Sequence, residues 1–385
     1  MTDPSYRASV LTSFGAGPTE VEELLDYNEN PFDHRRPGAV LGDEPFVRVW
    51  RAYADEAIRE GVVTCLRKRL VQLRFPIREG ISETEAYRQA TRRGLWPETD
   101  EGPAFEDPAG LRLRLHPTPA GHVPVLATEN RADFVTLVQA LTRRNEPVPL
   151  PDAMGAVMVV GYNNWDRIRA YREAWAKRVS DASEAAWQQE FRRLIPQKEK
   201  YQDRFVLLSD GPYSAVPAER LGLDERTWRQ LSLVIRREHE CAHYYTRRVL
   251  GAMRNNMLDE LIADYMGITG ALGEYRADWF LRFVGLEAYP VYRIGGRLEN
   301  YRGGLSDKAF RVLQALVYHA ACNLERFGSV LTAVSDESRR ITLALQTLTR
   351  LTLEELASKD AAGHLERAYA EATAAVLMEP VQALA

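Results

Sequence analysis

Cysteine is scarce in this sequence, with only three residues among 385, namely Cys65, Cys241 and Cys322. They are too few and too widely spaced for the disulfide framework of a secreted protein. The first residues, MTDPSYRASVLTSFGAG, also lack the basic stretch and apolar run of a secretory signal. We therefore expect a cytoplasmic protein in a reducing environment.

Long apolar runs and an excess of positive charge are missing as well. No stretch approaches the roughly 18 consecutive apolar residues of a membrane-spanning helix. The formal net charge is −4, whereas non-specific nucleic-acid binding needs a basic surface that displaces counterions. We therefore expect neither membrane nor nucleic acid as a partner. The sequence leaves the oligomeric state open.

The hydrophobic patterning indicates a predominantly helical α+β fold. We divide the chain into a mainly helical region 1–100, an α/β region 101–220 and a helical, metal-binding region 221–385. A small antiparallel or mixed sheet in the N-terminal half should pack on the helical C-terminal half. Four segments have strand-like patterns, namely 111–117, 122–128, 154–164 and 204–216.

Helical periodicity accounts for most of the remaining chain. Residues 46–75 read as one long amphipathic helix, and Ser82 with Glu85 forms the capping-box pattern of a helix that ends at Gly94. From Asp224 onward the patterns predict only helices, at 224–250, 257–272, 275–284, 306–327, 335–357 and 361–378.

The chemistry centres on the sequence His-Glu-Cys-Ala-His at residues 239–243. In a helix, positions four apart differ by about 40° around the axis and about 6 Å along it. The imidazoles of His239 and His243 should therefore leave one face and be able to bind one metal ion. Glu240 points in another direction, so it can stand beside the metal and accept a proton from water.

A second pair of residues follows on the next predicted helix. Glu260 and Asp264, in DELIADYMG, are again four positions apart. One carboxylate can be the third metal ligand, and the other can accept the free ring N–H of a ligand histidine. The intervening GAMRNN segment allows a tight reversal that brings the two helices side by side.

His-Glu-x-x-His followed by Glu-x-x-x-Asp resembles the gluzincin, or thermolysin-like, zinc metallopeptidases. The resemblance covers about residues 204–270, and Asp259 stands where many gluzincins have asparagine. It implies that His239, His243 and Glu260 bind Zn²⁺, that Glu240 is the general base and that Asp264 supports a ligand histidine. It also implies an edge strand before the active helix, for which 204–216 is correctly placed, where an extended substrate pairs.

The leading hypothesis is a zinc-dependent hydrolase, a metallopeptidase that processes a restricted peptide or protein substrate. A further donor must stabilise the oxyanion. His319 and Tyr292 are the named candidates, and Tyr289, Tyr301, Arg293 and Arg297 are further ones.

Two other functions use the same residues. Two histidines and one carboxylate also form the facial triad of non-haem Fe²⁺ oxygenases, which modify peptides or small molecules. A metal that clamps two helices of a non-catalytic binding module is the third hypothesis. Glu240 separates them, because a hydrolase needs a base there and an oxygenase does not.

Overall fold

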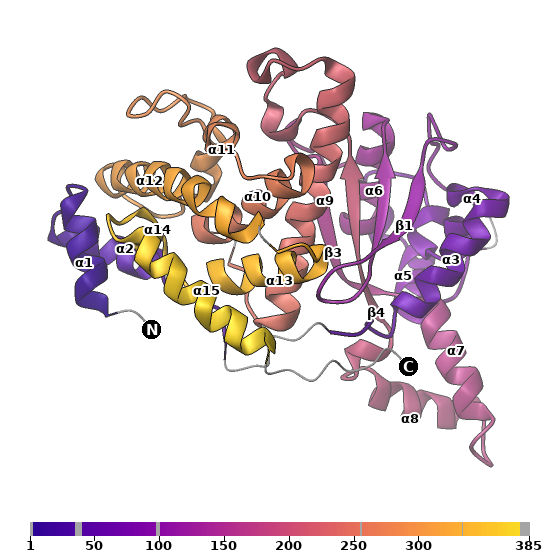
Figure 1. Ribbon diagram of the computed structural model, residues 1–385. Coiled ribbons are helices and arrows are strands. Elements are labelled where there is room, and N and C mark those ends of the chain that lie inside the picture. The colour runs from indigo at the N-terminus through magenta and orange to yellow at the C-terminus, as the bar shows by residue number, and fades with distance from the viewer. Residues whose placement is uncertain (1–2, 35–40, 98–100, 255, 333, 378–385) are drawn as a thin grey trace. The chain divides into compact units, whose positions relative to one another are not determined.

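The chain divides into two compact units. Unit 1 contains residues 1–42, 118–120 and 212–385, and unit 2 contains 43–117 and 121–211. The computed structural model describes residues 3–34, 41–97, 101–254, 256–332 and 334–377 (Figure 1). This division differs from the three regions expected from the sequence, because the first 42 residues join the C-terminal half.

Pairs of residues far apart in the sequence hold the N-terminal segment in unit 1. Arg7 forms an ion pair with the buried Glu354 at 3.1 Å. The same carboxylate accepts a hydrogen bond from Asn28 at 3.1 Å, and Asn30 donates to the carbonyl of Thr349 at 2.8 Å. Local sequence patterns carry no information about such pairs, so the sequence grouped this segment with residues 43–100 in one region.

Unit 2 is built on a four-stranded mixed sheet, as the sequence predicted. Its strands lie in the order β1-β2-β4-β3. β1 pairs antiparallel with β2, β2 pairs parallel with β4, and β4 pairs antiparallel with β3. The strands are β1 (Arg112–His116), β2 (Val123–Thr128), β3 (Ala156–Asn163) and β4 (Gln202–Ser209).

The expectation that 204–216 contains an edge strand is wrong. β4 is an interior strand with a neighbour on each side, so its backbone cannot pair with a substrate. Every residue from Phe205 to Ser209 is buried, which is typical of an interior strand and not of a half-exposed edge. The boundary between the two units also falls within this segment, between Gly211 and Pro212.

Two apolar cores stabilise unit 2. In the first, α3 (Val47–Glu60) and α6 (Arg131–Thr142) pack on the sheet through Trp50 and Phe134. In the second, the indoles of three tryptophans gather, namely Trp165, Trp175 and Trp187. The other helical elements are α4 (Val62–Arg67), η1 (Val71–Arg74), η2 (Ile81–Glu83), α5 (Glu85–Arg93), α7 (Trp165–Ala176), α8 (Glu184–Leu194) and η3 (Lys198–Lys200).

Two expected helices of this unit are corrected. The long helix at 46–75 is interrupted at Gly61, whose φ of 88° is incompatible with a continuing right-handed helix. The helix after Ser82 begins at Glu85 instead, because the Thr84 side chain accepts the hydrogen bond from the Tyr87 amide. Its predicted end at Gly94 is confirmed.

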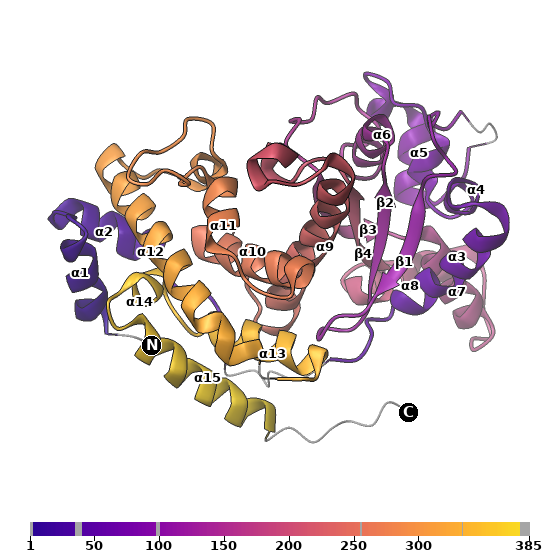
Figure 2. The same ribbon diagram turned by 45° about the horizontal axis from the view of Figure 1, so that its top comes forward.

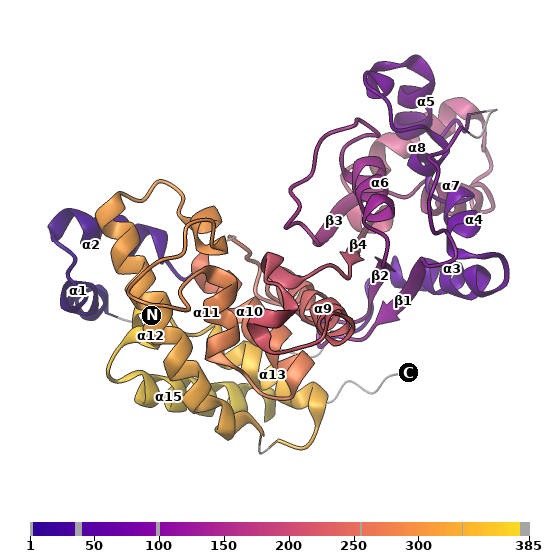
Figure 3. The same cartoon turned by 90° about the horizontal axis from the view of Figure 1, so that it is seen from above.

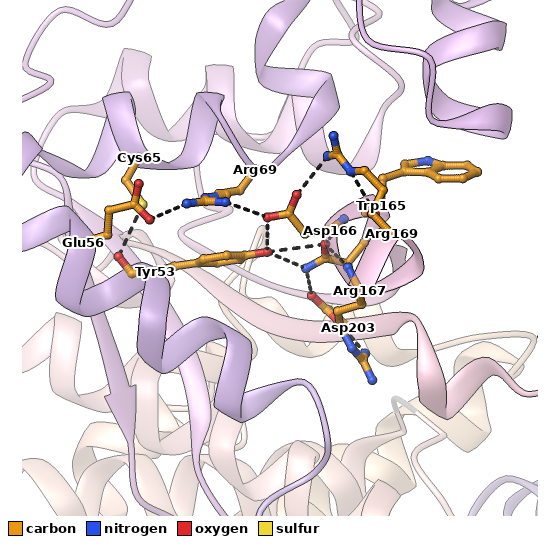
Figure 4. A network of polar contacts seen from close by, with 10 residues as sticks. Tyr53, Glu56, Cys65, Arg69, Trp165, Asp166, Arg167, Arg169 and Asp203 are labelled. Carbon is orange, nitrogen blue, oxygen red and sulfur yellow. Dashed lines mark hydrogen bonds and ion pairs between the residues drawn. The ribbon is translucent and has the colours of Figure 1, made fainter. Parts of the chain in front are cut away.

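A buried polar network fixes the start of β4 (Figure 4). Asp203 accepts hydrogen bonds from Trp50 at 2.8 Å, Asn164 at 2.6 Å and Arg167 at 2.7 Å. Burial raises the pKa of this carboxyl group, and the hydrogen bonds oppose that rise. Since its partners come from α3, from the N-cap of α7 and from α7 itself, one side chain ties two helices to the sheet.

Unit 1 is helical throughout its described residues, apart from one isolated bridge between Ala288 and Val291. Helix α9 lies against α10 (Figure 3), and α12 lies against α2, α14 and α15 (Figure 2). The expected helix at 335–357 is two helices, because Thr352 and Glu355 form a capping box that starts a new one. The elements are α1 (Pro4–Ser13), α2 (Pro18–Tyr27), η4 (Tyr213–Ala215), η5 (Ala218–Leu221), α9 (Glu225–Val249), α10 (Met257–Leu272), α11 (Ala277–Val284), η6 (Arg297–Tyr301), α12 (Asp307–Thr332), α13 (Glu337–Leu348), α14 (Leu353–Ala357) and α15 (Ala361–Leu377).

Among the described residues, no helix has both the length and the apolar character required to cross a bilayer.

Candidate metal centre

Helix α9 carries the two histidines of the motif. Its N-cap is Asp224, whose side chain accepts a hydrogen bond from the Thr227 amide at 2.9 Å. A stripe of apolar side chains, including Trp228 and Ile235, is fully buried. This burial takes His239 and His243 into the interior, where they are 8% and 4% exposed. A pair of exposed surface histidines is therefore excluded.

Helix α10 carries the two carboxylates and lies unusually close to α9. A Cβ atom at Gly267 would be 2.7 Å from the carbonyl oxygen of Ile235, and one at Gly270 would be 2.6 Å from Cγ of Glu238. At Gly267, where the close atom belongs to the backbone, only glycine allows this separation of the two helices. The close packing brings Glu260, in the first turn of α10, opposite the histidines.

The three predicted ligands converge. Nε2 of His239 and Nε2 of His243 are 3.1 Å apart, and the Glu260 carboxylate oxygens lie 3.6 Å and 3.5 Å from these nitrogens. Ligand atoms at about 2.0–2.2 Å from a tetrahedral zinc ion lie about 3.3–3.6 Å from one another. The separation of the donor atoms therefore fits a zinc ion bound by these three residues.

Asp264 is placed as the sequence predicted. Its Oδ1 atom lies 2.8 Å from Nδ1 of His239. If Nδ1 carries the proton, His239 donates it to Asp264 and Nε2 is free to bind a metal. Arg297 forms an ion pair with the other oxygen of Asp264. The charge of the buried carboxylate is thus balanced on the side away from the histidine.

Tyr213 is a member of this network that the sequence did not indicate. Its hydroxyl lies 3.0 Å from Nδ1 of His239, donates to Asp264 at 2.5 Å and accepts from Arg297 at 2.8 Å. Its amide donates to Ser232 of α9 at 3.0 Å. The short η4 element that carries it shows no periodic pattern, so nothing in the sequence connects Tyr213 with His239.

The backbone directly after Tyr213 is strained. Ser214 and Ala215 have φ values of 52° and 55°, in the left-handed region that residues with a Cβ atom avoid. Strain of this kind costs on the order of 1–3 kcal/mol per residue and is concentrated at functional sites. Here the turn holds the Tyr213 ring against the metal-binding helix.

The ligand side chains are strongly coupled electrostatically. Burial would lower the pKa of His243, but the hydrogen bond and negative charge of Glu260 outweigh it and raise this pKa to about 9. Burial would raise the pKa of Glu260, but the two histidines hold it well below its usual range. His243 is therefore protonated at neutral pH in the metal-free protein.

Glu240 has the properties of a general base. The pKa of its carboxyl group is raised, mainly because the group is buried. The positive charges of His239 and His243 oppose this rise, and the negative charge of Glu260 adds to it. Among the described residues it forms no hydrogen bond, and its side chain remains partly exposed. A carboxylate with a raised pKa and free oxygens beside a metal can accept a proton from water.

The structure gives the expected oxyanion donors His319 and Tyr292 contacts outside the group of predicted ligands. The ring of His319 packs among Phe14, Tyr289 and Tyr318. The hydroxyl of Tyr292 is engaged within its own loop, where it donates to the Gly296 carbonyl at 2.7 Å and accepts from the Glu299 amide at 3.2 Å. The sequence indicated both candidates by residue type alone. Neither has a partner residue at helical spacing that would show where its side chain points.

Tyr301 and Arg297 reach the site instead. Burial raises the pKa of the Tyr301 phenol, and the nearby negative charge of Glu260 raises it further. Both residues belong to η6, in the irregular segment in which the sequence had indicated several possible donors. Tyr301 is thus electrostatically coupled to the predicted ligand Glu260, and Arg297 forms an ion pair with Asp264.

A second group of metal-ligand side chains, in unit 2, is a poorer candidate. Ligand atoms of Glu56, Glu60 and Cys65 lie within 4.8 Å of one another. However, the two carboxylates form ion pairs with Arg69 and Lys68. Burial raises the pKa of the Cys65 thiol to about 11, so the thiolate that a metal requires is disfavoured.

Comparison with known proteins assigns a family but no activity. A family of unknown function (DUF7005) matches residues 9–360, so the chain belongs to this family. No curated protein and no solved structure matches it.

Proposed function

We propose that this member of the family is a zinc-dependent hydrolase, a cytoplasmic metallopeptidase that processes a restricted peptide or protein substrate. The observation that carries the proposal is the convergence of His239, His243 and Glu260 at 3.1–3.6 Å. The charges of all three act on the carboxyl group of Glu240. A metal that only clamps helices would have a closed set of ligands. Among the described residues this group has three members, which leaves a position open for water.

Each residue has a role in the proposed reaction. Zinc bound here would polarise the scissile carbonyl and make water acidic enough to react near neutral pH. Glu240 accepts the proton as the water oxygen bonds to the carbonyl carbon, and it then delivers that proton to the leaving nitrogen as the C–N bond breaks. Tyr301 donates a hydrogen bond to the developing oxyanion. Asp264 fixes the tautomer and orientation of His239.

The Fe²⁺ oxygenase is retained as the second candidate, because its facial triad uses the same donor set. Such an enzyme would bind Fe²⁺ at His239, His243 and Glu260 and would need dioxygen and an electron-donating co-substrate. The role of Glu240 separates the two candidates.

The test is the substitution Glu240→Gln. It keeps the size of the side chain but removes the base, and it removes no ligand. We expect metal content and melting temperature to stay near wild type, while cleavage of peptides from a mixed-sequence library falls by about 10²–10⁴-fold. Elemental analysis, thermal unfolding and mass spectrometry of the library supply the three measurements.

Two variants serve as controls. Glu238→Gln changes a carboxylate two positions earlier that forms an ion pair with Arg237, and it should keep full activity. The double variant His239→Ala with His243→Ala should lose the metal. A fully active Glu240→Gln enzyme, or turnover that requires dioxygen and a reductant, would overturn the hydrolase in favour of the iron enzyme.

A further inference from the structure

The ligand Glu260 occupies a part of α10 that needs external support. It lies in the first turn, where backbone amides have no partner within the helix and the ends of helices fray. Asn256 caps the Asp259 amide at 3.1 Å. The amide of Met257, the first residue of the helix, donates instead to the hydroxyl of Tyr27 at 3.0 Å.

The same hydroxyl holds the other side of the metal centre. Tyr27 donates to the carbonyl oxygen of Tyr301 at 2.7 Å. Its single oxygen therefore joins the first turn of α10, which carries Glu260, to the end of η6, which carries Arg297 and Tyr301. A further bond, from the Asn256 side chain to the Tyr27 carbonyl at 3.3 Å, links the start of α10 to the end of α2.

The chemical state of Tyr27 suits this double role. Burial of the hydroxyl raises the pKa of the phenol, and the nearby charges of Glu260 and Asp259 raise it further. The side chain is therefore neutral, with one proton to donate and lone pairs to accept. Phenylalanine in its place would keep the ring and lose both bonds.

We propose that Tyr27 is a positioning residue of the metal centre, which sets the distance between Glu260 and the two histidines by holding the first turn of α10 against η6. The proposal rests on the metal site of the proposed function. It makes a residue 230 positions before Met257 part of the metal-binding machinery.

The test compares Tyr27→Phe with Tyr6→Phe. The second variant is a matched control, because Tyr6 also lies in the N-terminal segment and its hydroxyl bonds to Nε2 of His364 at 2.9 Å instead of to the metal centre. Zinc affinity is measured by competition with a chromophoric chelator. We expect Tyr27→Phe to weaken zinc binding by about 10-fold, the low end of the range for groups that support metal ligands, and Tyr6→Phe to change it by less than about twofold.

A spectroscopic measurement separates positioning from a general loss of stability. The d–d absorption of the Co²⁺-substituted protein reports ligand geometry, so it should change in Tyr27→Phe and not in Tyr6→Phe. Equal zinc affinities and equal cobalt spectra in both variants would overturn the role of Tyr27. Failure of the wild-type protein to bind zinc would instead overturn the proposed function itself.

Amide hydrogen exchange of the wild-type protein provides a test without any substitution. Saturating zinc should slow exchange at Met257, whose amide is bound to Tyr27, if the first turn and the metal site are one cooperative unit. The Ala186 amide, at the N-cap of α8 in unit 2, should be unaffected. Unchanged exchange at Met257 would contradict the proposal even if Tyr27→Phe did not fold.

Discussion

Asp264 accepts hydrogen bonds from three side chains at once, and this sharing determines how strongly it acts on His239. The donors are His239, Tyr213 and Arg297. A carboxylate bonded to one histidine makes the imidazole a stronger ligand. Here the positive charge of Arg297 partly neutralises the negative charge of Asp264. We therefore expect His239 to be well oriented but to bind the metal less tightly.

The proton of His243 predicts how zinc binding depends on pH. With a pKa of about 9 in the metal-free protein, His243 is protonated at pH 7, and zinc must displace that proton. We expect close to one proton to be released per zinc bound at pH 7 and little release at pH 10. Calorimetric titration in two buffers with different ionisation enthalpies measures this number, and no release at pH 7 would show that His243 is neutral.

The same shift gives the sign of the pH dependence of stability. A group whose pKa rises on folding, here from an unfolded value near 6.5, stabilises the folded state fully below that value. Its contribution is lost as the pH rises through about 9. The metal-free protein should therefore lose stability between about pH 6.5 and 9 through this group, and saturating zinc should remove that part of the dependence.

Residue-level prediction succeeded where helical spacing carries the information. The separations of His239 from His243 and of Glu260 from Asp264 fix directions on two helices, and the structure brings all four side chains together. Tyr213 and Tyr27 could not be found in this way. Their contacts with the site depend on how distant segments pack, which no local pattern encodes.

At the scale of elements, the separation of α9 from α10 determines whether the ligands can meet. At Gly267 the obstacle to a larger residue is a backbone carbonyl, that of Ile235, which cannot move without moving the helix. At Gly270 the obstacle is the side chain of Glu238, which can rotate away. The two positions therefore form a matched pair.

Gly267→Ala should force the helices apart. We expect it to lower the free energy of unfolding by about 1–3 kcal/mol, as overpacking does, and to weaken zinc binding along with it. Gly270→Ala should be neutral or stabilise the helix by up to about 1 kcal/mol. Chemical denaturation and zinc titration of both variants check this pair, and a Gly267→Ala protein with wild-type zinc affinity would contradict the role of close packing.

Elements with clear amphipathic periodicity were predicted well, and those whose ends depend on backbone conformation were not. The bounds of α10 agree with the predicted 257–272, and the Asp224 cap of α9 is confirmed. The helix expected at 46–75 instead breaks at Gly61, because one left-handed residue ends it within an otherwise continuous pattern. The apolar run 205–208 within β4 indicated a strand, but its two neighbours come from distant parts of the chain.

At the scale of the whole molecule, the chain forms two compact units, and the proposed metal ligands all belong to unit 1. A ligand that binds only the folded state stabilises by about 2.7 kcal/mol at 100 times its dissociation constant. We expect calorimetry to resolve two unfolding transitions, and we expect zinc to raise the midpoint temperature of only one of them.

Fluorescence assigns the transition that zinc shifts. Trp228 and Trp279 are the tryptophans of unit 1, so replacing Trp279 by phenylalanine should reduce the fluorescence change of the zinc-sensitive step and leave that of the other step unchanged. A single transition, or two that rise equally with zinc, would show that the units unfold together.

The ion pair between Arg7 and Glu354 has a consequence for the order in which the protein matures. The two residues are 347 positions apart, so at roughly 5–20 residues per second the ribosome makes the second about 20–70 seconds after the first. Residues 43–211 emerge entirely within this interval. The N-terminal helices are therefore made well before their partner Glu354, and the residues of unit 2 are able to fold in the meantime. Tyr27 likewise meets its partners Met257 and Tyr301 only after residues 43–211 have been made, so the proposed metal centre would form after the residues of unit 2 have been synthesised.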